Sequence, residues 1–296
     1  MKNIFISLIF ILIFNTGSFG QDLYPYIKIG ETTETMQQAS EKITEALQNN
    51  SFTILGSYSP SNKSTLKVIA FTRTDLKNTV VKVTDRGALA AVFKVGLVSK
   101  NGKVTMSYTN PEYILRAYLA DNYNTYKSTF QKFDADLKTA FSTVGNEFKP
   151  FGGTVKVQNL KKYHYKITMP YFTDPITLNE FSSFEEGLKI IEANLKAKKG
   201  ATTTLVYKLV YEKENIAVFG IGLQSKEKGE SYFLPIIGEG HIAAMPYEII
   251  LQGKKATMLA GKYRLALNWP ELTMGTFMKI MSTPGDIEDT LEAVCE

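Results

Sequence analysis

The order of apolar and polar residues along this chain predicts a β-hairpin unit that occurs twice. In the first unit, an apolar run rich in small and β-branched residues, Leu89–Val98, precedes Asn101-Gly102 and a second, alternating run, Val104–Tyr108. Two such runs joined by Asn-Gly are a strong hairpin signal. Asn110-Pro111 then ends the second strand and begins a helix.

A similar unit lies near the C-terminus, between Gly240 and Pro270. Its leading glycine and its alanine pair, Ala243-Ala244, correspond to Gly87 and Ala90-Ala91 of the first unit. We therefore expect one fold made twice in a single chain.

The rest of each half completes the same order of strand, helix, two strands, hairpin and helix. Apolar residues spaced three and four apart predict helices over 32–51 and 182–199, the second capped by Ser183. Strands are predicted over 24–29, 52–58, 66–71, 155–157, 163–169, 203–211 and 217–223, and further helices over 111–145, 272–281 and 286–294. This order predicts an α+β fold with largely antiparallel sheets covered by helices on one face.

The stretch Lys149–Gly153 contains one proline and two glycines, which break regular elements and mark the predicted domain boundary. We expect a first α+β domain over 21–149 and a second, similar one over 150–296. A length of 296 residues is enough for two such domains with cores of their own.

The first twenty residues have the pattern of a secretory signal peptide. Lys2 precedes a largely apolar run, Ile4–Phe14, and Ser18-Phe19-Gly20 offers small residues for cleavage before Gln21. We expect export to the periplasm or the extracellular space; an uncleaved N-terminal anchor is the alternative. No other apolar segment has the length of a membrane helix, so no transmembrane segment is expected in the mature chain.

Composition and charge argue against two classes of protein. Apolar residues make up 44% and charged residues 21%, which are values of globular proteins rather than disordered ones. Without Lys2, 33 basic and 29 acidic residues remain, and the lysines are scattered, so nucleic acid is not an expected partner. The only cysteine, Cys295, excludes an intrachain disulfide and either cross-links two chains or packs against its own helix.

The hairpin units resemble the bacterial domain-of-unknown-function family 302, whose strands end in a Tyr-x-x-Pro pattern before a helix. The first unit ends in Tyr108-Thr109-Asn110-Pro111 and the second in Leu267-Asn268-Trp269-Pro270. Pro246-Tyr247 matches the family's strand start, where the first unit has Phe93. The resemblance covers most of 33–119 and 183–281. It implies a tandem repeat of compact, saddle-shaped domains with curved sheets, and it implies no activity and no catalytic residue.

Residues for catalysis or metal binding are few. The chain has two histidines, His164 and His241, and no cysteine pair, so we expect no metal site. The sequence Gly220-Ile221-Gly222 follows a predicted strand but leads into a charged loop instead of a helix, which excludes a dinucleotide cradle. We therefore expect no cofactor and no catalytic residue.

A curved sheet covered on one face leaves a concave side where a ligand can bind. The residues expected to line it are a histidine and the aromatic side chains of the two units: Phe93, Tyr108, His241, Tyr247, Tyr263 and Trp269. The competing interpretation is that these side chains simply pack strands onto helices.

The sequence thus favours an exported, non-enzymatic protein that binds a small apolar or aromatic ligand, or a protein partner, through a cleft. Two alternatives stay open: a structural or assembly component of a cell-envelope complex, and an enzyme with an interdomain site that uses His241. A homodimer is compatible with each of them.

Overall fold

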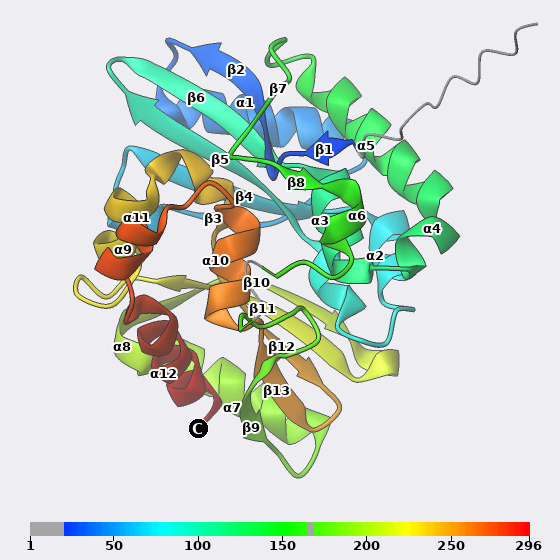
Figure 1. The fold of residues 1–296 in the computed structure, drawn as a ribbon, viewed down its shortest axis with the longest axis vertical. Helices are drawn as coiled ribbons and strands as arrows, with labels where there is room; N and C mark the ends of the chain where they lie inside the picture. The colour runs from blue at the N-terminus through cyan, green and yellow to red at the C-terminus, as the bar shows by residue number, and fades with distance from the viewer. Residues whose placement is uncertain (1–20, 165–167) are drawn as a thin grey trace, which may run out of the picture.

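The computed structural model describes residues 21–164 and 168–296. It contains two large open antiparallel sheets, one from each half of the chain, and a small two-stranded sheet (Figure 1). The predicted α+β class with antiparallel sheets is confirmed. The expected signal segment, 1–20, lies outside the described residues. Part of the predicted strand 163–169 also lies outside them, and its described residues form no strand.

The first half forms a six-stranded sheet in the order β3-β4-β5-β6-β2-β7. Its strands are β2 (Tyr26–Thr32), β3 (Thr53–Tyr58), β4 (Leu66–Thr72), β5 (Phe93–Lys100), β6 (Lys103–Thr109) and β7 (Lys149–Phe151). Its helices are α1 (Met36–Asn49), α2 (Thr74–Val80), α3 (Pro111–Leu119), α4 (Asn122–Thr125) and α5 (Lys127–Phe141), with 3-10 turns η1 (Pro60–Asn62) and η2 (Gly87–Ala91).

The second half forms a five-stranded sheet in the order β10-β11-β12-β13-β9. Its strands are β9 (Ile176–Glu180), β10 (Thr203–Tyr211), β11 (Ile216–Leu223), β12 (Tyr247–Gln252) and β13 (Lys255–Met258). Its helices are α7 (Phe184–Lys196), α8 (Lys199–Thr202), α9 (Glu230–Ile237), α10 (Gly261–Asn268), α11 (Met274–Lys279) and α12 (Thr283–Cys295), with 3-10 turns η3 (Glu212–Glu214) and η4 (Glu239–Ala244). In each of these two sheets the first strand in sequence, β2 or β9, pairs with the second strand of the hairpin, β6 or β13.

Short elements connect the two halves. Strand β1 (Asp22–Leu23) pairs with β8 (Val155–Lys156), and α6 (Val157–Leu160) follows directly. Strand β7 pairs with β2, so the predicted boundary stretch begins inside the first sheet and leaves it at Gly152-Gly153. Both glycines have positive φ, 96° and 83°, which other residues rarely adopt.

The two helices predicted from apolar spacing are confirmed, and their caps explain where they begin. The Thr35 hydroxyl accepts from the Gln38 amide while the Gln38 side chain accepts from the Thr35 amide, a complete capping box. Ser183 caps α7 by accepting from the Glu186 amide at 3.1 Å.

The prediction that each hairpin unit begins with a strand at its alanine pair is wrong, because both alanine pairs lie in 3-10 turns. In η4 the turn packs on the first sheet, and a Cβ built on Gly96 of β5 would lie 2.8 Å from Ile242 and 2.9 Å from the Ala243 amide. Small residues are needed for this close approach. The predicted turn itself is confirmed, since Asn101 and Gly102 have φ of 53° and 74°.

Two predicted helix boundaries also differ. The helical region after Pro111 is divided where Ala120 takes a φ of 48°, which ends α3. Pro284-Gly285, expected to separate two helices, lies in the first turn of α12, where proline leaves no amide unsatisfied.

The two halves share one apolar core and meet along their sheets. The edge strands β3 and β10 pack against each other so closely that a Cβ on Gly56 would lie 1.9 Å from the Val206 carbonyl oxygen. Turn η4 lies on the first sheet, and η2 contacts β11 of the second. Over 21–164 and 168–296, no helix has the length and apolar character needed to cross a membrane.

Candidate functional site

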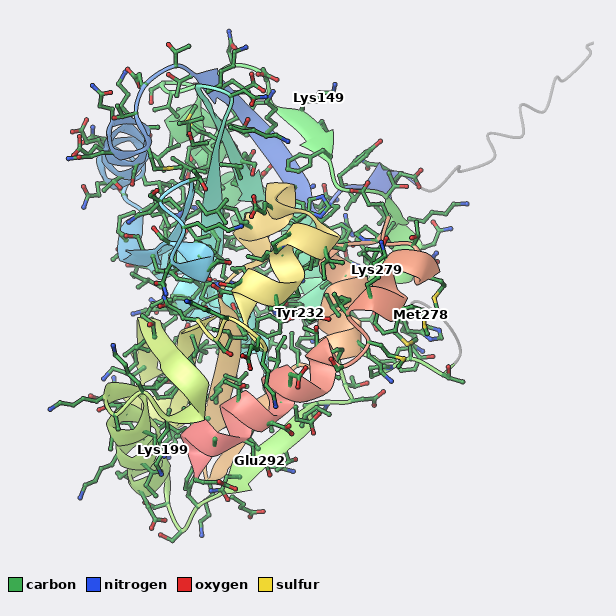
Figure 2. The ribbon with its side chains drawn as sticks, turned by 90° about the vertical axis from the view of Figure 1, so that its left-hand side faces the viewer. Lys149, Lys199, Tyr232, Met278, Lys279 and Glu292 are labelled. Atoms are coloured by element: carbon green, nitrogen blue, oxygen red, sulfur yellow. The ribbon has the colours of Figure 1, made fainter. Side chains whose placement is uncertain are left out.

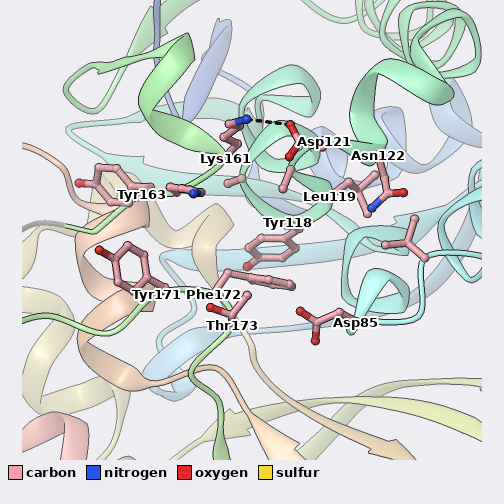
Figure 3. A pocket seen from close by; sticks show the side chains of 14 residues that line it. Asp85, Tyr118, Leu119, Asp121, Asn122, Lys161, Tyr163, Tyr171, Phe172 and Thr173 are labelled. Atoms are coloured by element: carbon pink, nitrogen blue, oxygen red, sulfur yellow. Dashed lines mark hydrogen bonds and ion pairs between the residues drawn. The ribbon is translucent and has the colours of Figure 1, made fainter.

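A pocket of about 440 Å³ opens between the C-terminal end of α3, the loop before η2 and residues 161–163 and 171–173 of the segment that connects the halves (Figure 3). Its volume is in the range of small-molecule binding sites. The pocket therefore lies between the first half and the segment that connects the halves.

The rim of the pocket carries charges of both signs. The positive φ of Ala120 ends α3 and places Asp121 and Asn122 at the opening, where Asp121 pairs with Lys161 at 2.8 Å. Asp85 and Lys162 also line the pocket. The near balance of these charges favours a ligand with polar groups but little net charge.

The floor of the pocket is aromatic. Tyr118 of α3 stacks on Phe172 with ring centroids 5.0 Å apart and an interplanar angle of 26°. Behind Phe172 lie Tyr263 of α10, at 6.1 Å between centroids, and the guanidinium of Arg86, 5.0 Å from the ring centroid. Phe172 is buried although it belongs to a connecting segment, and it anchors that segment to both halves.

Tyr163 holds the connecting segment against the second half, and Tyr171 makes a contact within the segment. The Tyr163 hydroxyl donates to the Ala266 carbonyl of α10 at 3.0 Å, and Tyr171 contacts His164 through its hydroxyl at 3.2 Å. Tyr171 is 36% exposed and stands at the mouth (Figure 3). The pocket thus has a fixed aromatic floor and a more accessible aromatic rim.

A buried ion cluster lies next to this floor. Lys94 of β5 donates to Glu248 of β12, which also accepts from the Tyr207 hydroxyl of β10 at 2.9 Å. Arg264 of α10 approaches the other Glu248 oxygen at 3.8 Å and stacks 3.7 Å over the Tyr247 ring. The cluster joins the first sheet to the second.

For Glu248 and for Lys94 alike, burial and the charge of the other residue shift the pKa in opposite directions. Burial alone would raise the pKa of Glu248, but Lys94 and Arg264 outweigh it and hold that pKa below its ordinary value. Burial lowers the pKa of Lys94, although Glu248 opposes the shift. We conclude that Glu248 is ionised at neutral pH.

Tyr118 connects the pocket and the ion cluster. It lines the aromatic pocket and also a small internal cavity of about 20 Å³, whose wall includes Lys94, Glu248 and Arg264. That space is sufficient for one water molecule among several polar partners. A ligand that displaces Tyr118 would therefore disturb the contact between the halves.

A second buried acid, Glu230, begins α9. It accepts from the Tyr58 hydroxyl at 2.7 Å, the Ser61 amide at 3.0 Å and the Leu223 amide at 3.2 Å. Burial raises the pKa of Glu230 to about 7 despite these bonds. The residue ties η1 of the first half to β11 of the second.

Of the predicted site residues, His241 lies in an aromatic cage. It stacks on Tyr26 at 5.0 Å and contacts Phe151 and Trp269 at 5.8 and 5.7 Å between ring centroids. Its Nε2 is 3.3 Å from a Glu271 oxygen, and burial lowers its pKa to about 4. The imidazole is therefore neutral at pH 7.

The aromatic residues predicted to line a cleft are buried, and they do not gather at one place. Phe93 contacts Phe71 and Phe133, and Tyr108 contacts Phe141, inside the first half. Tyr247 lies under Arg264, and Tyr263 supports Phe172 from behind the pocket. Trp269 lines a different, smaller pocket beside α10.

Sequence reasoning missed Tyr118, Phe172 and the ion cluster. A usable signal was the density of aromatic residues in the segment that connects the halves, where Tyr163, Tyr171 and Phe172 lie within ten positions. Connections are usually polar, so such residues indicate contact with another surface. The pairing of Lys94 with Glu248 had no signal, because 154 positions separate them.

The structure also shows the surroundings of the glycines in Gly220-Ile221-Gly222 and of Cys295. Gly220 and Gly222 lie inside β11, where added Cβ atoms would meet Tyr207 and Tyr58, so they serve packing. Cys295 is buried on α12, and burial raises the pKa of its thiol to about 12. Across the part of the chain that the structure describes, no group of three or more His, Cys, Asp or Glu residues is arranged to hold a metal ion.

Comparison with known proteins identifies no relative: no family model, no curated protein and no solved structure matches the chain.

Proposed function

We propose that this chain is an exported binding protein whose pocket, between the first half and the connecting segment, takes a small aromatic molecule with polar substituents. The stacked pair Tyr118–Phe172 at the floor of the pocket carries the proposal. An aromatic ring can extend such a stack by offset or edge-to-face contact with favourable energy. The charged rim can hydrogen-bond polar substituents.

The matching order of elements in the two halves supports the same proposal. Both halves follow one order of strands, helices and turns, which supports a tandem duplication of the kind implied by the resemblance to family 302. Under this plan the domains are 21–149 and 150–296, and the pocket is made by their connection. Binding at such a junction needs no catalytic group.

Export is part of the proposal, and the sequence of residues 1–20 supports it. Lys2, the apolar residues that follow it and the small residues Ser18 and Gly20 have the pattern of a cleaved secretory signal.

The test uses ligand-observed NMR on the mature chain with a panel of bicyclic aromatic probes such as indole, quinoline and naphthalene sulfonate. We expect saturation transfer to at least one probe, and a roughly two- to tenfold weaker affinity in Phe172→Leu, which keeps apolar volume but loses the stack. Phe151→Ala is the control, since Phe151 lies in the His241 cage and does not line this pocket. Equal binding by wild type and Phe172→Leu would reject the site.

A further inference from the structure

The surface around α11 exposes an unusual number of methionines. Met274, Met278 and Met281 are 46%, 57% and 59% exposed, and they are three of the six large apolar side chains found exposed in the described part of the chain. Figure 2 shows this helix at the surface, where the Lys279 carbonyl accepts from the Tyr232 hydroxyl at 3.0 Å. Methionine is flexible and polarizable, so it adapts to apolar ligands of different shape.

Next to these methionines, a narrow pocket of about 170 Å³ enters the space between α10 and α11. Its walls are mainly apolar and include Leu265, Ala266, Trp269, Leu272, Met274 and Phe277. The pocket is separate from the aromatic pocket described above, although α10 forms part of the support of both. Its size suits a single unbranched hydrocarbon chain better than a folded partner.

One cation stands at the edge of this apolar space. Lys262 lines the pocket and is exposed, and within the described residues it pairs with no carboxylate. It also lines an adjoining, wider depression that reaches Pro284 and Gly285 in the first turn of α12. The partial positive charge of a helix N-terminus favours an anion there. Glu288 also lines the depression and repels an anion, which leaves Lys262 as the place for it.

We propose that this pocket binds a fatty acid, with its hydrocarbon chain between α10 and α11 and its carboxylate paired with Lys262. Burial of the hydrocarbon chain against the apolar walls supplies most of the affinity, because each methylene removed from water adds to it. The exposed ion pair contributes much less and selects for a carboxylate over a neutral head group.

The chain provides its own reporter for this site, because Trp269 is its single tryptophan and lines the pocket. The probe is ω-bromooctanoate, whose terminal bromine quenches indole fluorescence on contact. We expect saturable quenching of Trp269 emission by this probe and its displacement by unlabelled octanoate. Octanol should displace it more weakly, since it lacks the charge.

Two variants test the carboxylate contact and the apolar pocket separately. Lys262→Gln should weaken octanoate roughly two- to fivefold and leave octanol unchanged. Ala266→Phe places a ring in the pocket and should abolish the quenching while the thermal unfolding temperature stays near that of wild type. If this variant does not fold, Lys262→Gln still decides between a carboxylate site and a neutral one.

Three results would overturn the proposal. Quenching that does not saturate, or that is the same in Ala266→Phe, would show that the probe collides with the surface without entering the pocket. Equal affinity for octanoate and octanol in wild type would remove the role of Lys262. Quenching by brominated phospholipid vesicles, with none by the free acid, would assign the methionine surface to a membrane instead.

Discussion

Lys94 of β5 and Glu248 of β12 form an ion pair that is closed off from solvent between the two sheets, with side chains only 10% and 5% exposed. The two residues come from different halves of the chain. Charges buried in this way are stable only when each keeps its partner. The pair therefore makes the stability of each half depend on the other.

Removal of one partner should be strongly destabilising. Lys94→Met leaves Glu248 buried with Tyr207 and the more distant Arg264, and we expect a loss of about 3 kcal/mol in the free energy of unfolding, measured in urea. Glu248→Gln should cost a similar amount. The double variant should cost less than the sum of the two by more than about 1 kcal/mol.

The exposed pair Lys208–Glu192, 2.6 Å apart with both side chains 39% exposed, is the matched control for this cycle. Its coupling should be below about 1 kcal/mol and should decrease with salt. Additive effects of Lys94→Met and Glu248→Gln would contradict the interpretation of the pair as an interaction between the halves.

Glu230 and His241 should make opposite contributions to the pH dependence of stability. The pKa of Glu230 rises from 4.5 to about 7 on folding, so its contribution of about 3 kcal/mol is complete below pH 4.5 and is lost as the pH rises through 7. The pKa of His241 falls from 6.5 to about 4, so its contribution is present above pH 6.5 and is lost as the pH falls through 4.

Between pH 4.5 and 6.5 the two slopes oppose each other, and single variants should reveal each one. In Glu230→Gln, unfolding free energy should rise with pH over this range more steeply than in wild type. In His241→Phe, which keeps the stack on Tyr26, it should fall. Urea titrations at several pH values measure both; unchanged slopes would mean that neither group shifts its pKa on folding.

We expect substitution by alanine to destabilise the protein at Gly96 and to have almost no effect at Gly240. Gly96→Ala places a Cβ within 2.9 Å of the Ala243 amide, so we expect a cost of about 1–3 kcal/mol. Gly240→Ala meets no atom within 4 Å and should change stability by less than about 0.5 kcal/mol. Thermal unfolding of the two variants makes the comparison, and equal losses would rule out the close contact of η4 with β5.

The mature chain is expected to begin at Gln21 when the full-length sequence is expressed in a bacterium. Intact-mass measurement of the exported protein checks this directly. The control is a variant with Phe10→Arg, which interrupts the apolar run of the signal and should keep the chain inside the cell. A product that retains residues 1–20 after export would favour the uncleaved anchor.

Much of the fold was predictable because its signals are local. Thr35 and Ser183 mark helix starts by side-chain caps, and Asn101-Gly102 marks the hairpin turn, each within a few residues. The alanine pair Ala90-Ala91 misled the prediction, since small residues favour a close-packed turn only when a second sheet is present. That second surface comes from the other half and leaves no local pattern.

The site was less predictable for the same reason. Aromatic residues of the hairpin units, such as Phe93 and Tyr108, looked suited to a cleft but fill the core. The pocket instead depends on how Phe172, in the connecting segment, meets Tyr118 of α3. Such a meeting depends on the packing of three segments, and no spacing within one of them specifies it.

The contact between β3 and β10 has a consequence for solubility. Each strand is the last one of its sheet, so its outer backbone groups pair with no further strand in that sheet. Unpaired strand edges are templates for aggregation, and here the two edge strands pack against each other across the halves. Separation of the chain at Gly152-Gly153 would uncover both edges at once. A half released in this way should self-associate through the strand that its counterpart now protects.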